Sequence, residues 1–150
     1  MEYKNRPAKK PNHHCILVVK SNNVQLILDG LLSRRAQRMK IFDSKSPESK
    51  TANKLKKKLG FPVHKDPYRY TGILSSEGFI KGDNIFNHID WIFSNFKPDF
   101  NTNEWEHSGM YYQLSFAWWG GLGTGYGPKI SSELARKLTK YNIDLEISIY

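Results

Sequence analysis

Residues 110–119, MYYQLSFAWW, and residues 143–150, IDLEISIY, decide the fold class of this chain. In both stretches apolar side chains recur at every second position, the pattern of a β-strand with one face in the core and the other toward water. The inward positions of the terminal stretch are Ile143, Leu145, Ile147 and Ile149. A partly wet sheet face favours an α+β protein, because a doubly wound sheet carries helices on both faces.

Two more strands are predicted upstream of these stretches. Cys15–Val19 is an apolar run rich in β-branched residues, and we expect it to be buried on both faces. Tyr70–Ser76 is the other predicted strand, and Gly78 and Gly82 mark its end. Helical periodicity begins at Val24 and extends toward Met39. Three further helix starts are marked by capping residues, which are Ser46 before Pro47, Asp83 or Asn84, and Ser131.

The predicted fold is therefore α+β, with a single four-stranded sheet, mixed or antiparallel, and helices packed mainly on one face. The length of 150 residues suits one domain. We expect residues 1–14 to form a flexible N-terminal arm and residues 15–150 to form the domain, with a basic helical insertion at about 34–59. The longest apolar run is far shorter than the roughly 20 residues that cross a bilayer, and no apolar segment follows the basic start, so we expect a soluble cytoplasmic protein.

Positive charge is concentrated in the first half of the chain. The sequence contains 23 Lys and Arg against 14 Asp and Glu, which gives a net charge of +9. Between Arg34 and Lys58 there are ten basic residues, opposed only by Asp43 and Glu48. Such a segment suits an anionic partner, either an acidic protein surface or nucleic acid. A helix face that only keeps the chain in solution explains the same charges, and the sequence leaves both interpretations open.

No set of residues predicts catalysis or metal binding. The glycine-rich stretch GGLGTGYGP at 120–128 lacks the GxGxxG and P-loop spacings, and Pro128 removes a backbone donor. Cys15 lies beside two histidines, but it opens a strand that is expected to be buried. A loop salt bridge explains His64 and Asp66 as well as an acid–base pair does. We therefore predict a non-enzyme with no catalytic, cofactor-binding or metal-binding residues.

Aromatic residues near the C-terminal glycines indicate a binding surface. Trp119, Tyr126 and Tyr150 are the rings least needed for the core. Proteins that bind single-stranded RNA stack such rings on bases, but the interleaved basic and aromatic run of those proteins is missing here. Because Trp and Tyr also dominate the energy of many protein interfaces, a protein interface is the favoured interpretation.

A family resemblance begins at residues 111–150, YYQLSFAWWGGLGTGYGPKISSELARKLTKYNIDLEISIY. A strand ending in aromatics, a glycine-rich break, an S-x-E-L-x-x-x-L helix and an alternating strand closing on Tyr resemble the C-terminal signature of an uncharacterised bacterial family, domain of unknown function 4279. Residues 59–78, LGFPVHKDPYRYTGILSSEG, are similar to the L-G-x-x-P segment of that family. The basic stretch Arg34–Lys58 departs from the family pattern, and Val63 stands where the family has Thr.

Members of that family resemble small immunity proteins encoded beside bacterial toxins, and no catalytic residues are established for them. The resemblance therefore implies a non-enzymatic immunity-type protein that neutralises a cognate bacterial toxin by protein–protein interaction. For this hypothesis we expect the toxin to present an acidic patch. The alternative is a nucleic-acid-binding protein or a phage-type inhibitor of a nucleic-acid-processing complex. The predicted partner-binding residues are Arg34, Arg35, Arg38, Lys50, Lys54, Lys57, Trp119 and Tyr126.

Overall fold

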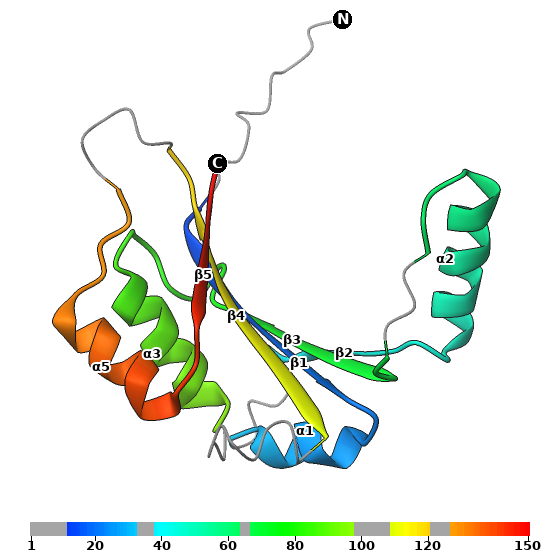
Figure 1. Cartoon of the computed structure of the whole chain (residues 1–150), viewed down its shortest axis with the longest axis horizontal. Helices are drawn as coiled ribbons and strands as arrows, with labels where there is room; N and C mark the ends of the chain where they lie inside the picture. The colour runs from blue at the N-terminus through cyan, green and yellow to red at the C-terminus, as the bar shows by residue number, and fades with distance from the viewer. Residues whose placement is uncertain (1–11, 33–37, 64–66, 98–108, 121–126) are drawn as a thin grey trace, which may run out of the picture.

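One open mixed β-sheet with associated helices makes up the fold, as the computed structural model of the protein shows (Figure 1). The structure describes residues 12–32, 38–63, 67–97, 109–120 and 127–150. Within these ranges the strands are β1 (His14–Ser21), β2 (Lys40–Asp43), β3 (Tyr70–Ser75), β4 (Met110–Trp118) and β5 (Leu145–Ile149). The helices are α1 (Val24–Gly30), α2 (Pro47–Lys58), α3 (Ile85–Asn95) and α5 (Ser132–Tyr141). The predicted α+β class is confirmed.

The strands lie in the order β2-β3-β1-β4-β5. Neighbouring strands are antiparallel except β4 and β5, which run parallel. A parallel pair cannot be joined by a tight turn, and the connection between these two strands contains α5. β1 is central, with Val18 opposite Ile73 of β3 and Gln113 of β4. β2 and β5 are therefore the two edge strands, and they lie at opposite edges of the sheet.

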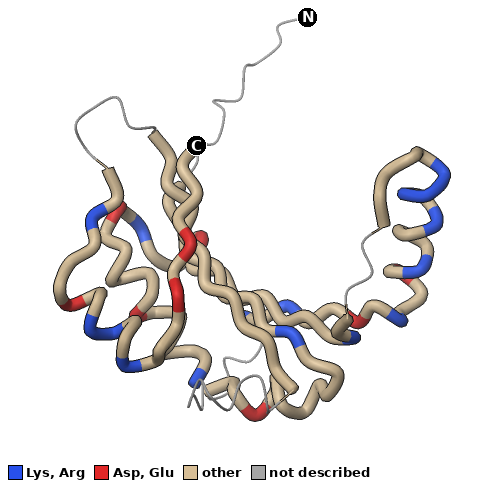
Figure 2. Tube along the Cα trace, in the orientation of Figure 1, with Lys and Arg blue, Asp and Glu red and all other residues tan. Residues whose placement is uncertain are grey.

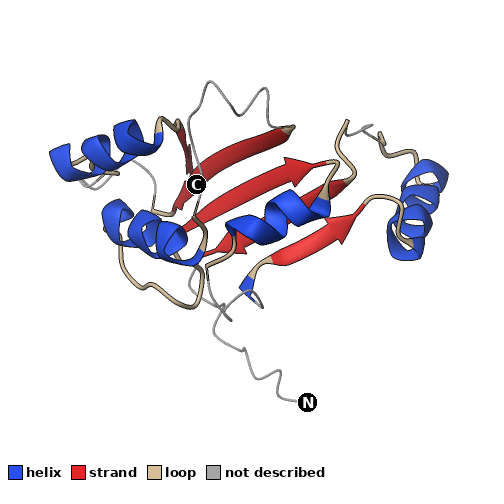
Figure 3. Cartoon of the chain, turned by 90° about the horizontal axis from the view of Figure 1, so that it is seen from below, coloured by secondary structure: helices blue, strands red, loops and turns tan. Residues whose placement is uncertain are grey.

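The hydrophobic core lies between one face of the sheet and the helices α1, α3 and α5 (Figure 3). Cys15, Leu17 and Val19 point into it from β1, and each is fully buried. Ile89 and Ile92 meet them from α3 and are also fully buried. The alternating apolar residues of the strands therefore lie on the one face of the sheet that the helices cover.

The sheet has five strands rather than the four predicted. The additional strand, β2, lies inside the segment predicted as a basic helical insertion, and it pairs with β3, so that Ile41 lies opposite Gly72. The helix expected to reach Met39 is also shorter, because α1 ends at Gly30. A strand of four residues contains too few alternations for periodicity to distinguish it from a helix.

β1 is fully buried on one face and only half-buried on the other, whereas the sequence predicts a strand buried, or nearly so, on both faces. Buried and half-buried residues alternate along the strand. The half-buried residues Ile16, Val18 and Lys20 lie on the other face of the strand, and no described helix packs on that face of the sheet (Figure 1). The physical reason is that only one layer of helices packs on the sheet, as in many antiparallel sheets.

Helix α2 takes no part in this helix layer. It follows β2 at one edge of the sheet and stands away from the sheet, on the side opposite α1 and α3 (Figure 1). None of its residues is buried. Across the described ranges, no helix has the length and apolar character that crossing a membrane requires.

Candidate partner-binding surface

Local sequence signals set the start of the basic helix α2. The hydroxyl oxygen of Ser46 accepts a hydrogen bond from the backbone N–H of Ser49 at 3.2 Å, which makes Ser46 the N-cap. Pro47 follows it, where a missing N–H leaves no helical bond unmade. Glu48 in the first turn and three lysines in the last turn both complement the helix dipole. The helix is therefore well specified locally, although it contributes nothing to the core.

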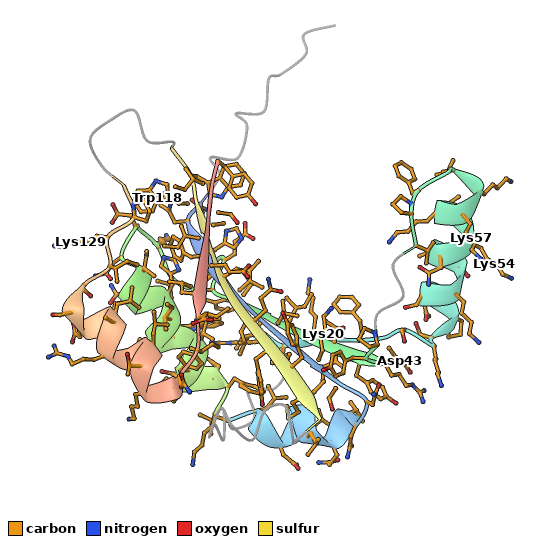
Figure 4. The ribbon with its side chains drawn as sticks, in the orientation of Figure 1. Lys20, Asp43, Lys54, Lys57, Trp118 and Lys129 are labelled. Carbon is orange, nitrogen blue, oxygen red and sulfur yellow. The ribbon has the colours of Figure 1, made fainter. Side chains whose placement is uncertain are left out.

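Lysines form the outer side of α2. Lys50, Lys54 and Lys57 are spaced by four and three residues, so they share one side of the helix. All three are exposed, and Lys54 and Lys57 point away from the sheet (Figure 4). Figure 2 shows the positive charge along this helix. Neither ion pair between described residues involves these lysines. The structure thus brings three of the predicted residues together in one surface, the lysine face.

The opposite side of α2 is apolar and equally exposed. Leu55 and Leu59 lie one turn apart and are 56% and 62% exposed, and Phe61, just beyond the helix, is 61% exposed. These three residues form the apolar stripe. A helix normally buries such a stripe against a core, whereas this stripe lies in contact with solvent.

Asp43 fixes the base of α2 to the sheet. Its carboxylate accepts hydrogen bonds from Nε and Nη2 of Arg69 at 2.9 and 3.0 Å and from the backbone N–H of Lys45 at 2.9 Å. Its backbone carbonyl accepts a hydrogen bond from the hydroxyl of Ser49, in the first turn of α2, at 2.9 Å. The Arg69 guanidinium, and next the N–H of Lys45, hold the pKa of Asp43 below its usual value. These bonds tie the turn before α2 to the sheet and so set the position of the helix.

The sheet face away from the helix layer, which we call the open face, carries exposed aromatic side chains. The row nearest α2 comprises, in cross-strand register, Phe42, Thr71, Lys20 and Tyr111. The next row comprises Lys40, Ile73, Val18 and Gln113. Phe42 is 51% exposed and Tyr111 is 45% exposed, and Lys20 projects on the side of the sheet where α2 stands (Figure 4).

Trp119 lies beyond the end of β4, at the edge of the sheet remote from α2. Its ring stacks on that of Tyr150 with centroids 4.4 Å apart. Nε1 of Trp119 is buried and has no hydrogen-bond partner among the described residues. Beside the pair is a shallow cavity of about 310 Å³, lined in part by His14 and Ile16. The lysine face and Trp119 are therefore separate surfaces, and Tyr126 lies outside the described residues.

Arg38 lies apart from both surfaces. Its guanidinium carbon is 4.5 Å from the ring centroid of Phe79 and 5.6 Å from that of Trp91, a residue of α3. The two rings stack at 4.8 Å. Arg38 thus makes a cation–π contact on the α3 side of the molecule instead of extending the lysine face. Arg34 and Arg35 lie outside the described residues.

Buried polar groups near Cys15 form a chain of hydrogen bonds. The hydroxyl oxygen of Ser76 accepts a bond from the backbone N–H of Cys15 at 2.8 Å and lies 2.7 Å from Nδ1 of His88. Nε2 of His88 donates to the carbonyl oxygen of Gly82 at 2.9 Å, so Nδ1 accepts the hydroxyl proton of Ser76. Burial raises the pKa of the Cys15 thiol and lowers the pKa of His88. Ser76 and His88 are both fully buried, so this chain serves the fold rather than a substrate.

The described residues include no group of three or more His, Cys, Asp or Glu side chains placed to hold a metal ion. His64 and Asp66 lie outside the described residues. Where the glycine-rich stretch rejoins the fold, a cavity of about 380 Å³ is lined by Lys129 and also by Asp83 and Glu133. The two carboxylates oppose the attraction that the lysine and the nearby helix starts exert on a phosphate.

Comparison with known proteins identifies no relative of this chain. It matches no family model, no curated protein and no solved structure. The resemblance to domain of unknown function 4279 therefore rests on the quoted sequence motifs alone.

The exposure of the apolar stripe is the feature that sequence reasoning missed. Leu55 and Leu59 are spaced four residues apart in the sequence, which indicates one side of a helix, and the structure places them one turn apart. Periodicity does not say whether another element covers that side. One signal was available: α2 has five lysines and a single leucine within its bounds, too few apolar residues for a helix that packs on a core.

Proposed function

We propose that the chain is a non-enzymatic binding protein of the immunity type, which neutralises a cognate bacterial toxin by binding it through the lysine face of α2. The observation that carries this proposal is a well-capped helix with no buried residue. Isolated helices of this length are only marginally stable in water. A helix that gains nothing from its own core is stabilised by contact with another molecule.

The charge of the lysine face specifies the partner. Lys50, Lys54 and Lys57 project into solvent from one side of α2, and a cluster of like charges attracts an oppositely charged surface over distances near the Debye length. The toxin therefore presents an acidic patch. Exposed charges of this kind act mainly on the association rate and on its salt dependence, and less on the dissociation rate.

The triple variant Lys50→Glu, Lys54→Glu, Lys57→Glu tests this proposal. We expect its association rate with the toxin, the product of the gene adjacent to that of this chain, to fall about tenfold or more at low salt. Surface plasmon resonance with immobilised toxin measures this rate at several salt concentrations. Because the three side chains are exposed and lie outside the core, the variant should fold normally.

A matched control separates the lysine face from net charge. Lys81, Lys97 and Lys129 are also exposed but lie outside α2, and their replacement by Glu changes the net charge by the same amount. The proposal predicts that this control binds at nearly the wild-type rate. Equal losses in both variants, or no loss in either, would contradict it.

Nucleic-acid binding is the second candidate, favoured by one observation, the five lysines of a single exposed helix. It predicts binding of single-stranded RNA or duplex DNA that persists at physiological salt, with a salt slope reflecting several phosphate contacts. Fluorescence anisotropy of labelled oligonucleotides against salt measures both quantities. Loss of binding in the Lys50, Lys54 and Lys57 variant would assign the function to nucleic acid, and absence of binding at physiological salt would leave the toxin as the partner.

A further inference from the structure

We propose that a second copy of this chain occupies the open face, and that the two copies form a reciprocal dimer in which α2 of each lies on the sheet of the other. Each chain presents a sheet face that no described helix covers and a helix whose apolar stripe nothing described covers. Each surface is the kind that normally covers the other. This proposal goes beyond the toxin-binding function, since it uses the side of α2 opposite the lysine face.

The position of α2 keeps it from covering its own sheet. Asp43 is bonded to Arg69, to the backbone of Lys45 and to Ser49 in the first turn of the helix. Ser44 N–H also donates to the carbonyl oxygen of Arg69 at 2.9 Å. Folding α2 down onto its own open face would break these bonds. The stripe is therefore held out from the chain that carries it and is available to another copy.

A two-fold axis makes this exchange self-complementary. In such an interface the same contact occurs twice. The stripe of each copy lies on the open face of the other, so both stripes and both open faces are covered. Because Lys54 and Lys57 point away from the sheet (Figure 4), the stripe on the other side of α2 faces the space above the open face. A copy related by a two-fold axis through that space places its own stripe there in return.

The exposed apolar side chains supply more than half of the area that a standard dimer interface buries. Leu55, Leu59, Phe61, Phe42 and Tyr111 are each 45–62% exposed. If the exposed half of a large side chain measures about 100 Å², these residues supply roughly 500 Å² per copy. A standard interface buries about 800 Å² per partner. The half-buried Ile16, Val18 and Ile73 of the open face extend the same surface.

The charges permit this arrangement although both copies are cationic. The lysine face lies on the outer side of α2, so docking the stripe leaves Lys50, Lys54 and Lys57 in water. Glu48 lies seven residues before Leu55, on the side of the stripe, whereas the open face carries Lys20 and Lys40. Docking therefore brings the carboxylate of Glu48 toward side chains of opposite charge on the other copy.

Sedimentation equilibrium of the full chain tests the dimer. We expect the wild type to be dimeric at micromolar concentrations. The variant Leu55→Glu, Leu59→Glu removes the stripe, and the variant Phe42→Ser, Tyr111→Ser removes the aromatic side chains of the open face. Each should raise the dimer dissociation constant at least about 100-fold, an effect typical of losing the central residues of an interface. Near-UV circular dichroism confirms that each variant retains the native core.

The control is the variant Lys54→Glu, Lys57→Glu, which alters the outer side of the same helix and should leave the dimer intact. A wild type that is monomeric at 100 µM would overturn the proposal. So would a dimer that survives loss of the stripe. A dimer that requires the stripe but tolerates Phe42→Ser, Tyr111→Ser would also overturn it, because the helices would then pair with each other and not with the sheets. Loss of toxin binding in the lysine variants with an intact dimer would separate this proposal from the proposed function.

Discussion

His88 is the side chain whose protonation state matters most to the fold. It is fully buried, and its ring meets that of Phe116 edge-on, with centroids 5.3 Å apart and planes at 79°. Its two nitrogens have distinct roles, since Nε2 donates to Gly82 and Nδ1 accepts from Ser76. A protonated ring would need to donate from both nitrogens. Burial of the ring favours the neutral imidazole, in which Nε2 donates and Nδ1 accepts.

This assignment predicts a loss of stability in mild acid. Burial holds the pKa of His88 below its usual value of about 6.5, so the unfolded chain takes up a proton at a pH where the native protein does not. Stability is fully present above about pH 6.5 and is lost progressively as the pH falls toward the native-state pKa. Urea unfolding followed by tryptophan fluorescence should show a lower free energy of unfolding at pH 5 than at about pH 7.

The variant His88→Gln checks the source of that slope. It should unfold more easily than wild type at pH 8, by about 1–3 kcal/mol, because it leaves buried polar groups with poorer partners. The free energy of unfolding of this variant should also depend much less on pH than that of the wild type. A His88→Gln variant with an unchanged slope would contradict the assignment.

Single elements show what local chemistry can and cannot specify. The starts of α2, α3 and α5 lie at the N-caps Ser46, Asn84 and Ser131, each of which accepts a backbone hydrogen bond. Ser46 and Ser131 are the predicted caps, and for α3 the structure selects Asn84 from the predicted pair Asp83 or Asn84. The strand β2 was not predicted, because its pairing with β3 stabilises it and that pairing is not encoded in a four-residue pattern. The exposure of Leu55 on α2 likewise depends on whether another element packs against the helix, which the local sequence does not specify.

The anchor at Asp43 is a prediction at this level. Replacing Asp43 with Ala removes the acceptors for Arg69 and Lys45 N–H, so α2 should open more often and its backbone amides should exchange with solvent several-fold faster. Hydrogen–deuterium exchange measures this directly. Because the pKa of Asp43 is lowered, the anchor should hold at neutral pH and be lost only as the pH falls through the native-state pKa, below the usual value of about 3.9.

A second ion pair, remote from α2, supplies the control for this variant. Asp90 of α3 pairs with Lys137 of α5, two helices on the side of the sheet opposite α2 (Figure 1). Asp90→Ala should leave exchange in α2 unchanged. If both variants, or neither, accelerated exchange in α2, the role given to Asp43 would be wrong.

At the scale of the whole molecule, the strand order separates residues that the sequence groups together. Lys54 and Trp119 are both among the predicted partner-binding residues, and the structure places them at opposite parts of the sheet, beyond β2 and beyond the end of β4. Strand order arises from contacts between residues remote in sequence, and no local pattern specifies it. The fold class and the single helix layer were predictable from alternation, whereas the open face and the isolated position of α2 required the structure.

The central claim is that α2, a helix without a place in its own core, is where the toxin binds. Hydrogen–deuterium exchange of the chain at one fixed concentration, with and without the toxin, tests it most directly. The account predicts that the amides of α2 exchange several-fold more slowly in the complex, while those of α5 on the opposite side of the sheet do not change. A complex that forms and leaves exchange in α2 unaltered would contradict the account.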